Sequence, residues 1–584
     1  MTIKITRRPS SQWTSPWPEH LHTRLQSIYA NRGISSAEDM ERSLQAMLRP
    51  QQLKGLEGAV TRLVQAVTTG ESMLIVGDFD ADGATSCAVG MLALRDMGAT
   101  QVQYLVPNRF EFGYGLTPEI VEVAKGYHPD LIITVDNGIS SIDGVAAAKA
   151  AGIGVVVTDH HLPGKELPDA DAIVNPNQPG CDFPSKNLAG VGVIFYLMSA
   201  LRSALREAGW FAARGIAEPN MGNYLDLVAL GTVADVVPRD SNNRILVHQG
   251  LQRIRSGRAR PGILALLEVA GRQRHRLVAS DLGFTVGPRL NAAGRLDDMS
   301  LGIECLLCES PDAARAMAVE LDDLNQDRRS IEAGMQQEAL KSLQSVVIND
   351  GADMPWGLCL YDSQWHQGVI GILASRIKER FYRPVIAFAD ANADEIKGSA
   401  RSIPGLHIRD ALDAVASAHP DLLSNFGRHA MAAGMSLKRS DFPRFQQAFD
   451  VVVRQTLRPE DLQSEILSDG ELSSDEFTLP LAHTLREAGP WGQHFPEPIF
   501  DGEFYLVQQR IVGEKHLKLV LAPDAARQQL VDAIAFNVDV SLWPNQSVEK
   551  VKLAYRLDVN EFRGRESVQL MVVHVEAVPV AALA

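Results

Sequence analysis

The sequence predicts an α/β protein of several domains, in which a mostly parallel sheet is joined by a long helix to a second α/β domain and then to a small C-terminal β-barrel. Three observations lead to this prediction. Apolar runs alternate with helical patterns from residue 73 onward, one apolar stripe continues over residues 311–347, and strand patterns follow one another in about the last 100 residues. A length of 584 residues also fits three or four domains of about 150 residues.

The first predicted domain occupies residues 66–310, after an N-terminal extension of short helices and turns over residues 1–65. Its expected strands are short apolar runs at 73–78, 101–107, 131–136, 154–159 and 171–176. Because these runs are continuous rather than alternating, we expect helices to cover both faces of the sheet, as in parallel sheets. Ligands of such sheets bind at the carboxyl ends of the strands.

The rest of the chain divides at a predicted connecting helix over residues 311–347. A serine, a proline and an aspartate form its start signal, and a helix of this length would span roughly 55 Å, enough to join two domains. A second α/β domain is expected at 348–458. The final domain, 459–584, begins with a segment, 459–476, that holds seven acidic residues and no basic one, which predicts a solvated boundary. Its later strands predict a barrel like the oligonucleotide-binding (OB) fold.

The charge balance of the chain argues at first sight against a nucleic-acid-binding protein. Asp and Glu number 71 against 56 Lys and Arg, a net charge of −15, whereas phosphate backbones attract basic proteins. Residues 253–276 differ, because they hold seven arginines and one glutamate. This segment is either a solvated face or a path for DNA, and the sequence leaves both open.

The sequence predicts a cytoplasmic protein. Its first residues lack the apolar core of a signal peptide, and no apolar run approaches the roughly 18 residues of a membrane span. The five cysteines are an odd number spread along the chain, which is typical of reduced thiols.

Polar residues follow three of the predicted strands at the point where each strand ends. These residues are Asp78, Asp80, Asp82, Asp136, Asp159, His160 and His161. A later helical segment supplies Asp226 and Asp235, of which Asp235 is the stronger candidate. Strand ends meet at one edge of a parallel sheet, so we expect these side chains to share a pocket. So many carboxylates cannot lie close together unless cations offset their repulsion.

Carboxylates together with imidazole favour two Mg²⁺ or Mn²⁺ ions over a thiolate zinc site. The expected ligands are Asp80, Asp82, Asp136, His160 and Asp235. Asp136 would bridge two ions about 3.5–4 Å apart, which activate a water and stabilise the leaving oxygen of a phosphoester. We expect His161 to contact the scissile phosphate or to help protonate the leaving oxygen, and Asp78 and Asp159 to orient the ligands.

Other interpretations of these residues stand beside this one. A single aspartate at a strand end is usually a helix cap or a turn residue. The segment of alternating aspartates is similar to the first half of a calcium loop, but it lacks the later ligand positions and follows a strand. The glycine patterns of dinucleotide-binding and nucleotide-binding loops, GxGxxG and GxxxxGKS/T, are absent where they would be needed.

An ordered set of segments between about residues 76 and 434 resembles the DHH phosphoesterase family. The segments are VGDFDADGATS, LVPNRFEFGYGL, TVDNGISS, TDHHLPG, LAGVGV, LGTVADVVP, GPRLNAAGRLDD, WHQGVIGILASRIKER and RHAMAAG. With the strand-rich tail, they are similar to the single-stranded-DNA-specific exonucleases of that family. The resemblance implies a DHH catalytic domain, a DHHA1 substrate domain and an OB domain.

The same resemblance implies an activity and partners. It implies a Mg²⁺- or Mn²⁺-dependent exonuclease that digests single-stranded DNA from the 5′ end to mononucleotides, in recombination and repair, including mismatch repair. It further implies a monomer that works with the single-stranded-DNA-binding protein and a repair helicase, with no membrane involved.

Substrate binding is expected from residues in the matching motifs that can hold a terminal phosphate or stack on a base. They are Arg109, Tyr114, Arg289, Ser399, Arg401 and His429. For Arg109 and Arg289, a structural pairing with the abundant carboxylates is the alternative. For Tyr114 and its neighbours Phe110 and Phe112, the alternative is packing in the core.

Two positions of the second domain differ from the family pattern, which usually has glycine at both. They are Arg428, within the segment GRHAMAAG, and Ala400, within KGSARS. Glycine in such loops permits close approach of the backbone to phosphate. We expect these two differences to affect the loop geometry or the level of activity, and not the metal site.

Two other functions fit the same fold. One is a non-catalytic scaffold that binds single-stranded DNA; such a protein would lose metal ligands, and none of the expected ligands is missing. The other is a phosphodiesterase for short oligonucleotides. The C-terminal barrel and the basic segment favour a longer strand instead.

Overall fold

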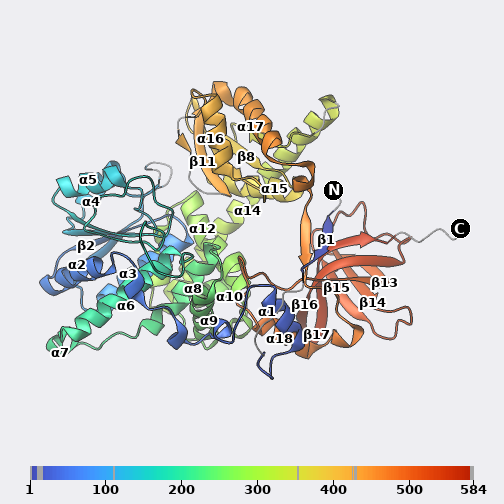
Figure 1. Cartoon of the computed structure of the whole chain (residues 1–584), viewed down its shortest axis with the longest axis horizontal. Helices are drawn as coiled ribbons and strands as arrows, with labels where there is room; N and C mark the ends of the chain where they lie inside the picture. Colours follow the sequence, from blue (N-terminus) through green and yellow to red (C-terminus); the bar gives the residue numbers. More distant parts are fainter. Residues whose placement is uncertain are drawn as a thin grey trace.

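The computed structural model describes residues 3–9, 17–108, 112, 114–350, 354–423, 425–426 and 431–578. Figure 1 shows a first α/β lobe with an added helical part (blue to green), a second α/β lobe (yellow to orange) and a barrel lobe (red). This architecture confirms the predicted fold class. No helix in the described part of the chain is long and apolar enough to cross a membrane.

The first lobe is built on a five-stranded, fully parallel sheet in the order β3-β2-β4-β5-β6. Its strands are β2 (Met73–Gly77), β3 (Val102–Leu105), β4 (Leu131–Val135), β5 (Gly154–Thr158) and β6 (Ala172–Val174). Each predicted apolar run is one of these strands. Every residue of β2 and β4 is buried, which explains why the runs are continuous in the sequence. All carboxyl ends therefore lie at one edge.

Helices cover both faces of this sheet, because successive side chains of a strand point to opposite faces. Ile75, Ile133 and Val156 pack against α2 (Leu56–Thr69), α3 (Ala81–Asp96) and α6 (Gly190–Glu207). Leu74, Ile132 and Val155 pack on the other face against α4 (Pro118–Lys125) and α5 (Ile142–Ala150). The helical part adds α7 (Trp210–Arg214), α8 (Leu225–Ala234), α9 (Ser241–Arg255), α10 (Pro261–Val269), α11 (Ala279–Asp281), α12 (Gly287–Leu296) and α13 (Ser300–Leu307).

The predicted connecting helix is α14 (Pro311–Asp350), which leads from the first lobe to the second (Figure 1). Its first half contributes Ala318 and Leu321 to the core of the first lobe. Its second half contributes Met335 and Ala339 to a core of the second lobe. Because one helix is packed in both cores, it fixes the two lobes relative to each other.

The second lobe has a mixed five-stranded sheet in the order β10-β11-β9-β8-β7, in which only β7 and β8 run parallel. Its strands are β7 (Leu358–Tyr361), β8 (Val385–Asp390), β9 (Glu395–Arg401), β10 (Asn425–Phe426) and β11 (Ala432–Lys438). Its helices are α15 (Ile370–Phe381), α16 (Ile408–Ala418) and α17 (Phe442–Thr456).

The barrel lobe is a closed barrel in the order β13-β14-β15-β17-β16, as the strand patterns predict. Its strands are β13 (Phe500–Val512), β14 (His516–Ala522), β15 (Val531–Ala535), β16 (Lys550–Phe562) and β17 (Arg565–Ala577). Two helices from distant parts of the chain, α1 (Thr23–Ala30) and α18 (Leu479–Glu487), pack into the core of this lobe.

The acidic segment 459–476 is more than the solvated boundary that its composition predicts. It contains β12 (Glu465–Ser468), which pairs in parallel with the N-terminal strand β1 (Lys4–Arg7). Its carboxylates form ion pairs with arginines of the N-terminal extension, including Arg24 with Glu476 and Arg32 with Asp469. Individual arginines far away in the sequence thus offset part of this negative charge.

Removal of Arg32 is expected to destabilise the barrel lobe. The side chains of Arg32 and Asp469 are each 1% exposed, and Arg32 Nη1 lies 2.8 Å from Asp469 Oδ1. Loss of one partner from a buried ion pair costs about 3–5 kcal/mol, because the other charge stays buried. In Arg32→Ala, hydrogen exchange should show lower protection of β13 and β17. Arg444→Ala is the control, because its pair with Asp421 is exposed; equal protection in both variants would contradict the prediction.

Candidate active site

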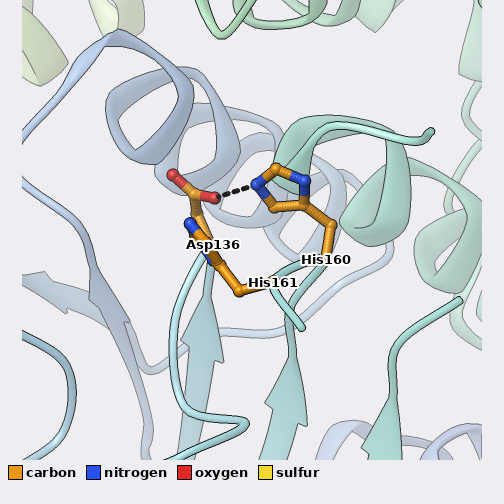
Figure 2. Close-up of side chains that lie close together, drawn as sticks. All are labelled: Asp136, His160 and His161. Atoms are coloured by element: carbon orange, nitrogen blue, oxygen red, sulfur yellow. Dashed lines mark ion pairs between the residues drawn. The ribbon is translucent and has the colours of Figure 1, made fainter. Parts of the chain in front are cut away.

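The polar residues that follow the strands of the first sheet lie together at its carboxyl edge. His160 Nε2, after β5, lies 3.1 Å from Asp136 Oδ1, after β4 (Figure 2). The same nitrogen lies 3.5 Å from Asp235 Oδ2 and 3.9 Å from Asp82 Oδ2. Asp235 directly follows α8, so a helix far along the chain completes the group.

Local structure fixes the aspartates that follow β2. Asp80 is the N-cap of α3, and its carboxylate accepts hydrogen bonds from the backbone N–H groups of Asp82 and Gly83. The carboxylate of Asp82 accepts hydrogen bonds from Gly190 N (2.6 Å) and Val191 N (2.9 Å) at the start of α6. The loop and two helix N-termini therefore orient these acids before any ion binds.

Asp136 adopts a left-handed backbone conformation, with φ of +61°, which is uncommon for a residue other than glycine. The next residue holds the turn, because Asn137 Nδ2 donates to Val76 O (3.1 Å) and Val135 O (2.9 Å). Gly190 leaves room for the carboxylate, since a Cβ at that position would lie 2.6 Å from Asp136 Oδ1. Strained backbone held by its surroundings is typical of functional sites.

Asp159 organises the histidine loop. Its carboxylate accepts hydrogen bonds from the backbone N–H groups of Ile139, His160 and His161, and from His161 Nδ1 at 2.7 Å. Burial alone would raise the pKa of Asp159, but these bonds and the nearby imidazoles lower it to about 2. Burial likewise opposes a charge on His161, but Asp159 and the other carboxylates raise the pKa of its imidazole to about 9.

The cluster concentrates negative charge in a buried space. The pKa of Asp82 is raised to about 7, mainly by burial and then by the neighbouring charge of Asp235. The pKa of Asp235 is also raised to about 7, mainly by burial and then by the charge of Asp80. Burial and several carboxylates raise the pKa of Asp136 well above its ordinary value. A cation in this space would remove the repulsion and let all of these groups ionise.

The residues fit a pair of divalent ions. Asp136 Oδ1 and His160 Nε2 are buried without a hydrogen-bond partner among the described residues, as expected of atoms that face an ion. Three groups have ligand atoms within 4.8 Å of one another. They are Asp78 with Asp80 and Asp136, Asp82 with His160 and Asp235, and Asp136 with His160 and His161. Oxygen-rich groups with one or two imidazoles suit Mg²⁺ or Mn²⁺.

Asp78, which we expect to orient the ligands, lies within the cluster itself. Its oxygen lies close enough to those of Asp80 and Asp136 to serve as a ligand itself. Sequence reasoning also missed Asn291 of α12, whose Oδ1 accepts a hydrogen bond from Ala81 N in the aspartate loop. Gly294, one helical turn further, lies so close to this loop that a Cβ there would overlap Phe79 O. The only signal for both was the motif GPRLNAAGRLDD.

Among the predicted substrate residues, Tyr114 lies beside the cluster of possible metal ligands. Its hydroxyl donates to Asp136 O (3.1 Å) and lies 3.1 Å from His161 Nδ1. Phe112, in contrast, packs against the core of the first lobe. Arg109 and Phe110 lie outside the described residues, as do Arg428 and His429 of the second lobe.

Arg289 makes the structural pairing that the sequence leaves open. Its Nη2 lies 2.7 Å from Asp322 Oδ1 of α14, and its Nη1 donates to Thr285 O. Ser399 and Arg401 lie side by side on β9, where Arg401 Nη1 donates to Ser399 Oγ (3.1 Å). Burial lowers the pKa of Arg401, and no carboxylate among the described residues offsets this. An anion would therefore find an unpaired guanidinium here.

Ala400, one of the two positions that differ from the family pattern, lies in strand β9 and not in a loop. It is fully buried in the core of the second lobe, among residues of α16 and α17. Because side chains alternate along a strand, its methyl group lies on the opposite face from Ser399 and Arg401. Alanine in place of glycine at this position therefore adds a methyl group to the core of the second lobe.

Three of the seven arginines of the basic segment 253–276 hold neighbouring parts of the structure together. Arg255 and Arg260 donate to backbone carbonyls at Leu277, Leu306 and Leu307. Arg276 pairs with Glu561 and Glu566 of the barrel lobe. Asp226, the weaker ligand candidate, caps this region by accepting from Arg260 N, 2.7 Å away. Arg276 thus joins the first lobe to the barrel lobe, whereas Arg255 and Arg260 hold parts of the first lobe together.

Comparison with known proteins agrees with this arrangement. The chain matches the family models DHH family, N-terminal domain (residues 72–232), DHHA1 domain (355–455) and RecJ OB domain (468–574). The single-stranded-DNA-specific exonuclease RecJ of Dickeya dadantii is 59% identical over 98% of this chain and 99% of its own length. RecJ of Escherichia coli is 57% identical over 98% of both chains.

A solved structure with a similar fold contains a divalent metal ion. RecJ from Thermus thermophilus in complex with Mn²⁺ has a TM-score of 0.76 to this structure at 30% identity, covering 95% of this chain and 76% of that chain. A structure of the same protein in complex with Mg²⁺ has a TM-score of 0.72. By its sequence over the whole length, its three matched domains and its fold, the chain belongs to the RecJ family of single-stranded-DNA-specific exonucleases, within the DHH family.

Proposed function

We propose that the chain is a metal-dependent exonuclease that digests single-stranded DNA in the 5′→3′ direction, releases 5′-mononucleotides, and acts in recombination and repair. The buried cluster carries this proposal. Two of its three groups of possible metal ligands, Asp78 with Asp80 and Asp136 and Asp82 with His160 and Asp235, meet where His160 Nε2 lies 3.1 Å from Asp136 Oδ1. No expected ligand is missing, so a non-catalytic scaffold is disfavoured.

We propose that Asp78, Asp80 and Asp136 hold one divalent ion, and that Asp82, His160, Asp235 and again Asp136 hold the other. When bound, two such ions activate a water and stabilise the leaving oxygen of a phosphodiester. Asp159 fixes the ring of His161 through Nδ1, so that this residue can contact the scissile phosphate or protonate the leaving oxygen. Tyr114 holds the backbone of Asp136 in place and closes the site beside His161.

For the 5′ end we propose a terminal phosphate site in the second lobe, formed by Ser399 and Arg401. Support comes from the buried guanidinium of Arg401, which lacks a carboxylate partner in the described part of the chain. Arg109 and His429 are proposed to join this site from the neighbouring motifs. Arg289 would take part only if its pair with Asp322 opened.

We further propose a cytoplasmic monomer that the single-stranded-DNA-binding protein and a repair helicase recruit to its substrate. The support for these partners is the family to which the chain belongs. Sedimentation or light scattering of the purified chain tests the monomer, and a dimer at micromolar concentration would contradict it.

An assay with end-labelled strands tests the direction and the substrate. A 5′-labelled single strand should lose its label as a mononucleotide from the start of the reaction. A 3′-labelled strand should instead shorten gradually and release its label last. Duplex DNA and RNA of the same sequence are the controls. Early release of the 3′ label, or equal rates on short oligoribonucleotides, would favour a different phosphodiesterase of the same fold.

A further inference from the structure

A single turn of π-helix, η6 (Leu282–Val286), lies between α11 and α12 of the first lobe. Such turns are rare and often lie at functional sites, because the wider turn accommodates an extra residue. Leu282 and Val286 are buried, whereas Phe284 is 81% exposed, more than any other large hydrophobic residue of the described chain. The π-helical turn thus presents an aromatic ring to solvent.

This turn lies next to the candidate active site. Gly283 packs against Val233, two residues before the candidate ligand Asp235, at a distance where a Cβ would lie 3.1 Å from Val233 Cγ1. Val236, directly after Asp235, has a φ of +60° and is 61% exposed. A β-branched residue rarely adopts this conformation. Two apolar side chains are therefore held in solvent by unusual backbone beside the metal cluster.

Val236 and Phe284 line one cavity, of about 490 Å³, between the first lobe and the barrel lobe. Phe284 also lines a second cavity, of about 610 Å³, between α12, α14, α15 and two loops of the barrel. The ring of Phe284 therefore lies where the two cavities adjoin.

The second cavity is strongly basic. Its charged residues are Arg295, Arg328, Arg329, Arg376, Lys515 and Glu332. Glu332 pairs with Arg328 and Arg376, whereas no ion pair to Arg329 or Lys515 exists within the described residues. Positive charge beside an exposed aromatic ring is the combination with which proteins bind single-stranded nucleic acid, through phosphates and stacked bases. An apolar peptide carries no negative charge to pair with these basic residues, so it fits the cavity less well.

We infer that Phe284 is a stacking platform for one base of the undigested strand, between the metal cluster and the barrel lobe. The phosphates next to that base lie in the basic cavity, near Arg329 and Lys515. This inference rests on the proposed function, since it names the residue that holds the polymer outside the catalytic cluster. A duplex hides the faces of its bases, so the platform also favours single strands over paired ones.

Binding measurements on three variants test the platform. Each is made in a chain that also carries Asp136→Ala, so that the strand is not digested, and fluorescence anisotropy reports the affinity for a 5′-phosphorylated single strand. Phe284→Ala should weaken binding about 5- to 150-fold, the range that one stacked base contributes. Phe284→Trp should retain it. Tyr127→Ala, a change at a half-exposed aromatic after α4, should have no effect.

Strands with a single abasic position distinguish stacking from other roles. When the abasic position is the one that stacks, Phe284→Ala should cause no further loss, and at the other positions the full loss should remain. Unchanged affinity of Phe284→Ala, or an equal loss on every abasic strand, would overturn the inference. The first result would indicate instead that the two cavities bind a protein partner. If the proposed function itself is wrong, the chain with intact Phe284 will show no preference for single-stranded DNA, neither in binding measured by anisotropy nor in the assay with end-labelled strands.

Discussion

Asp136→Ala is expected to abolish release of nucleotides from single-stranded DNA while the fold remains intact. Asp136 supplies an oxygen to two of the three possible ligand groups, and its Oδ1 is buried without a hydrogen-bond partner in the described chain. In the site we propose, Asp136 would hold both ions, so each would lose a ligand in this variant. Metal ions contribute several kcal/mol to the stabilisation of the transition state, so the rate should fall by roughly 10³-fold or more.

Calorimetry with Mn²⁺ separates a lost site from a lost fold. Asp136→Ala should bind Mn²⁺ more weakly or with fewer ions per chain, with unchanged circular dichroism. Asp136→Asn is a second variant, because asparagine tolerates the left-handed backbone at this position. Asp169→Asn is the control, since that carboxylate is exposed and, within the described part of the chain, pairs only with Lys149. Full activity of both Asp136 variants would refute the role of this residue as the shared ligand.

Gly190→Ala is expected to cause the next largest loss, although Gly190 has no side chain to take part in chemistry. A methyl group there would lie 2.6 Å from both Cβ and Oδ1 of Asp136, so either the side chain of Asp136 or the start of α6 must move. Gly190 N also donates to Asp82 Oδ2, and a shift of the helix start would disturb that bond as well. A misplacement of about 1 Å costs roughly 10²-fold in rate.

Gly192→Ala, two residues further along α6, is the matched control. A methyl group there would lie 3.1 Å from Leu188 Cδ2, the flexible end of a side chain that can move away. We expect near-normal activity in this variant and a loss of about 10²-fold in Gly190→Ala, measured as nucleotide release at saturating Mn²⁺. Equal activity of the two would mean that the close approach of α6 to Asp136 does not matter.

The net charge of −15 does not describe the surfaces that meet DNA. Part of the acid excess is the metal cluster itself, and part lies in residues 459–476, where N-terminal arginines pair with it. In the basic segment 253–276, Arg255 and Arg260 are bound to backbone carbonyls and Arg276 to the barrel lobe. Arg329 and Lys515, which line the basic cavity beside Phe284, come from segments of the chain far from 253–276.

The sequence alone determined the strands of the first sheet and the polar residues at their ends. A strand buried on both faces must be continuously apolar, and a residue that binds a ligand at its end interrupts the run, so both features are local. The connecting helix was predictable for the same reason, because its apolar stripe repeats within a few residues. Asp80, Asp82, Asp136 and His160 could therefore be chosen without coordinates.

Only the tertiary structure decided which distant groups meet. The pairing of Arg289 with Asp322 and the parallel pairing of β1 with β12 join residues far apart in the chain. The face on which Ala400 lies depends on the register of β9 against its neighbours. Such contacts follow from how whole helices and sheets pack, and side-chain spacing along the sequence carries no information about that packing.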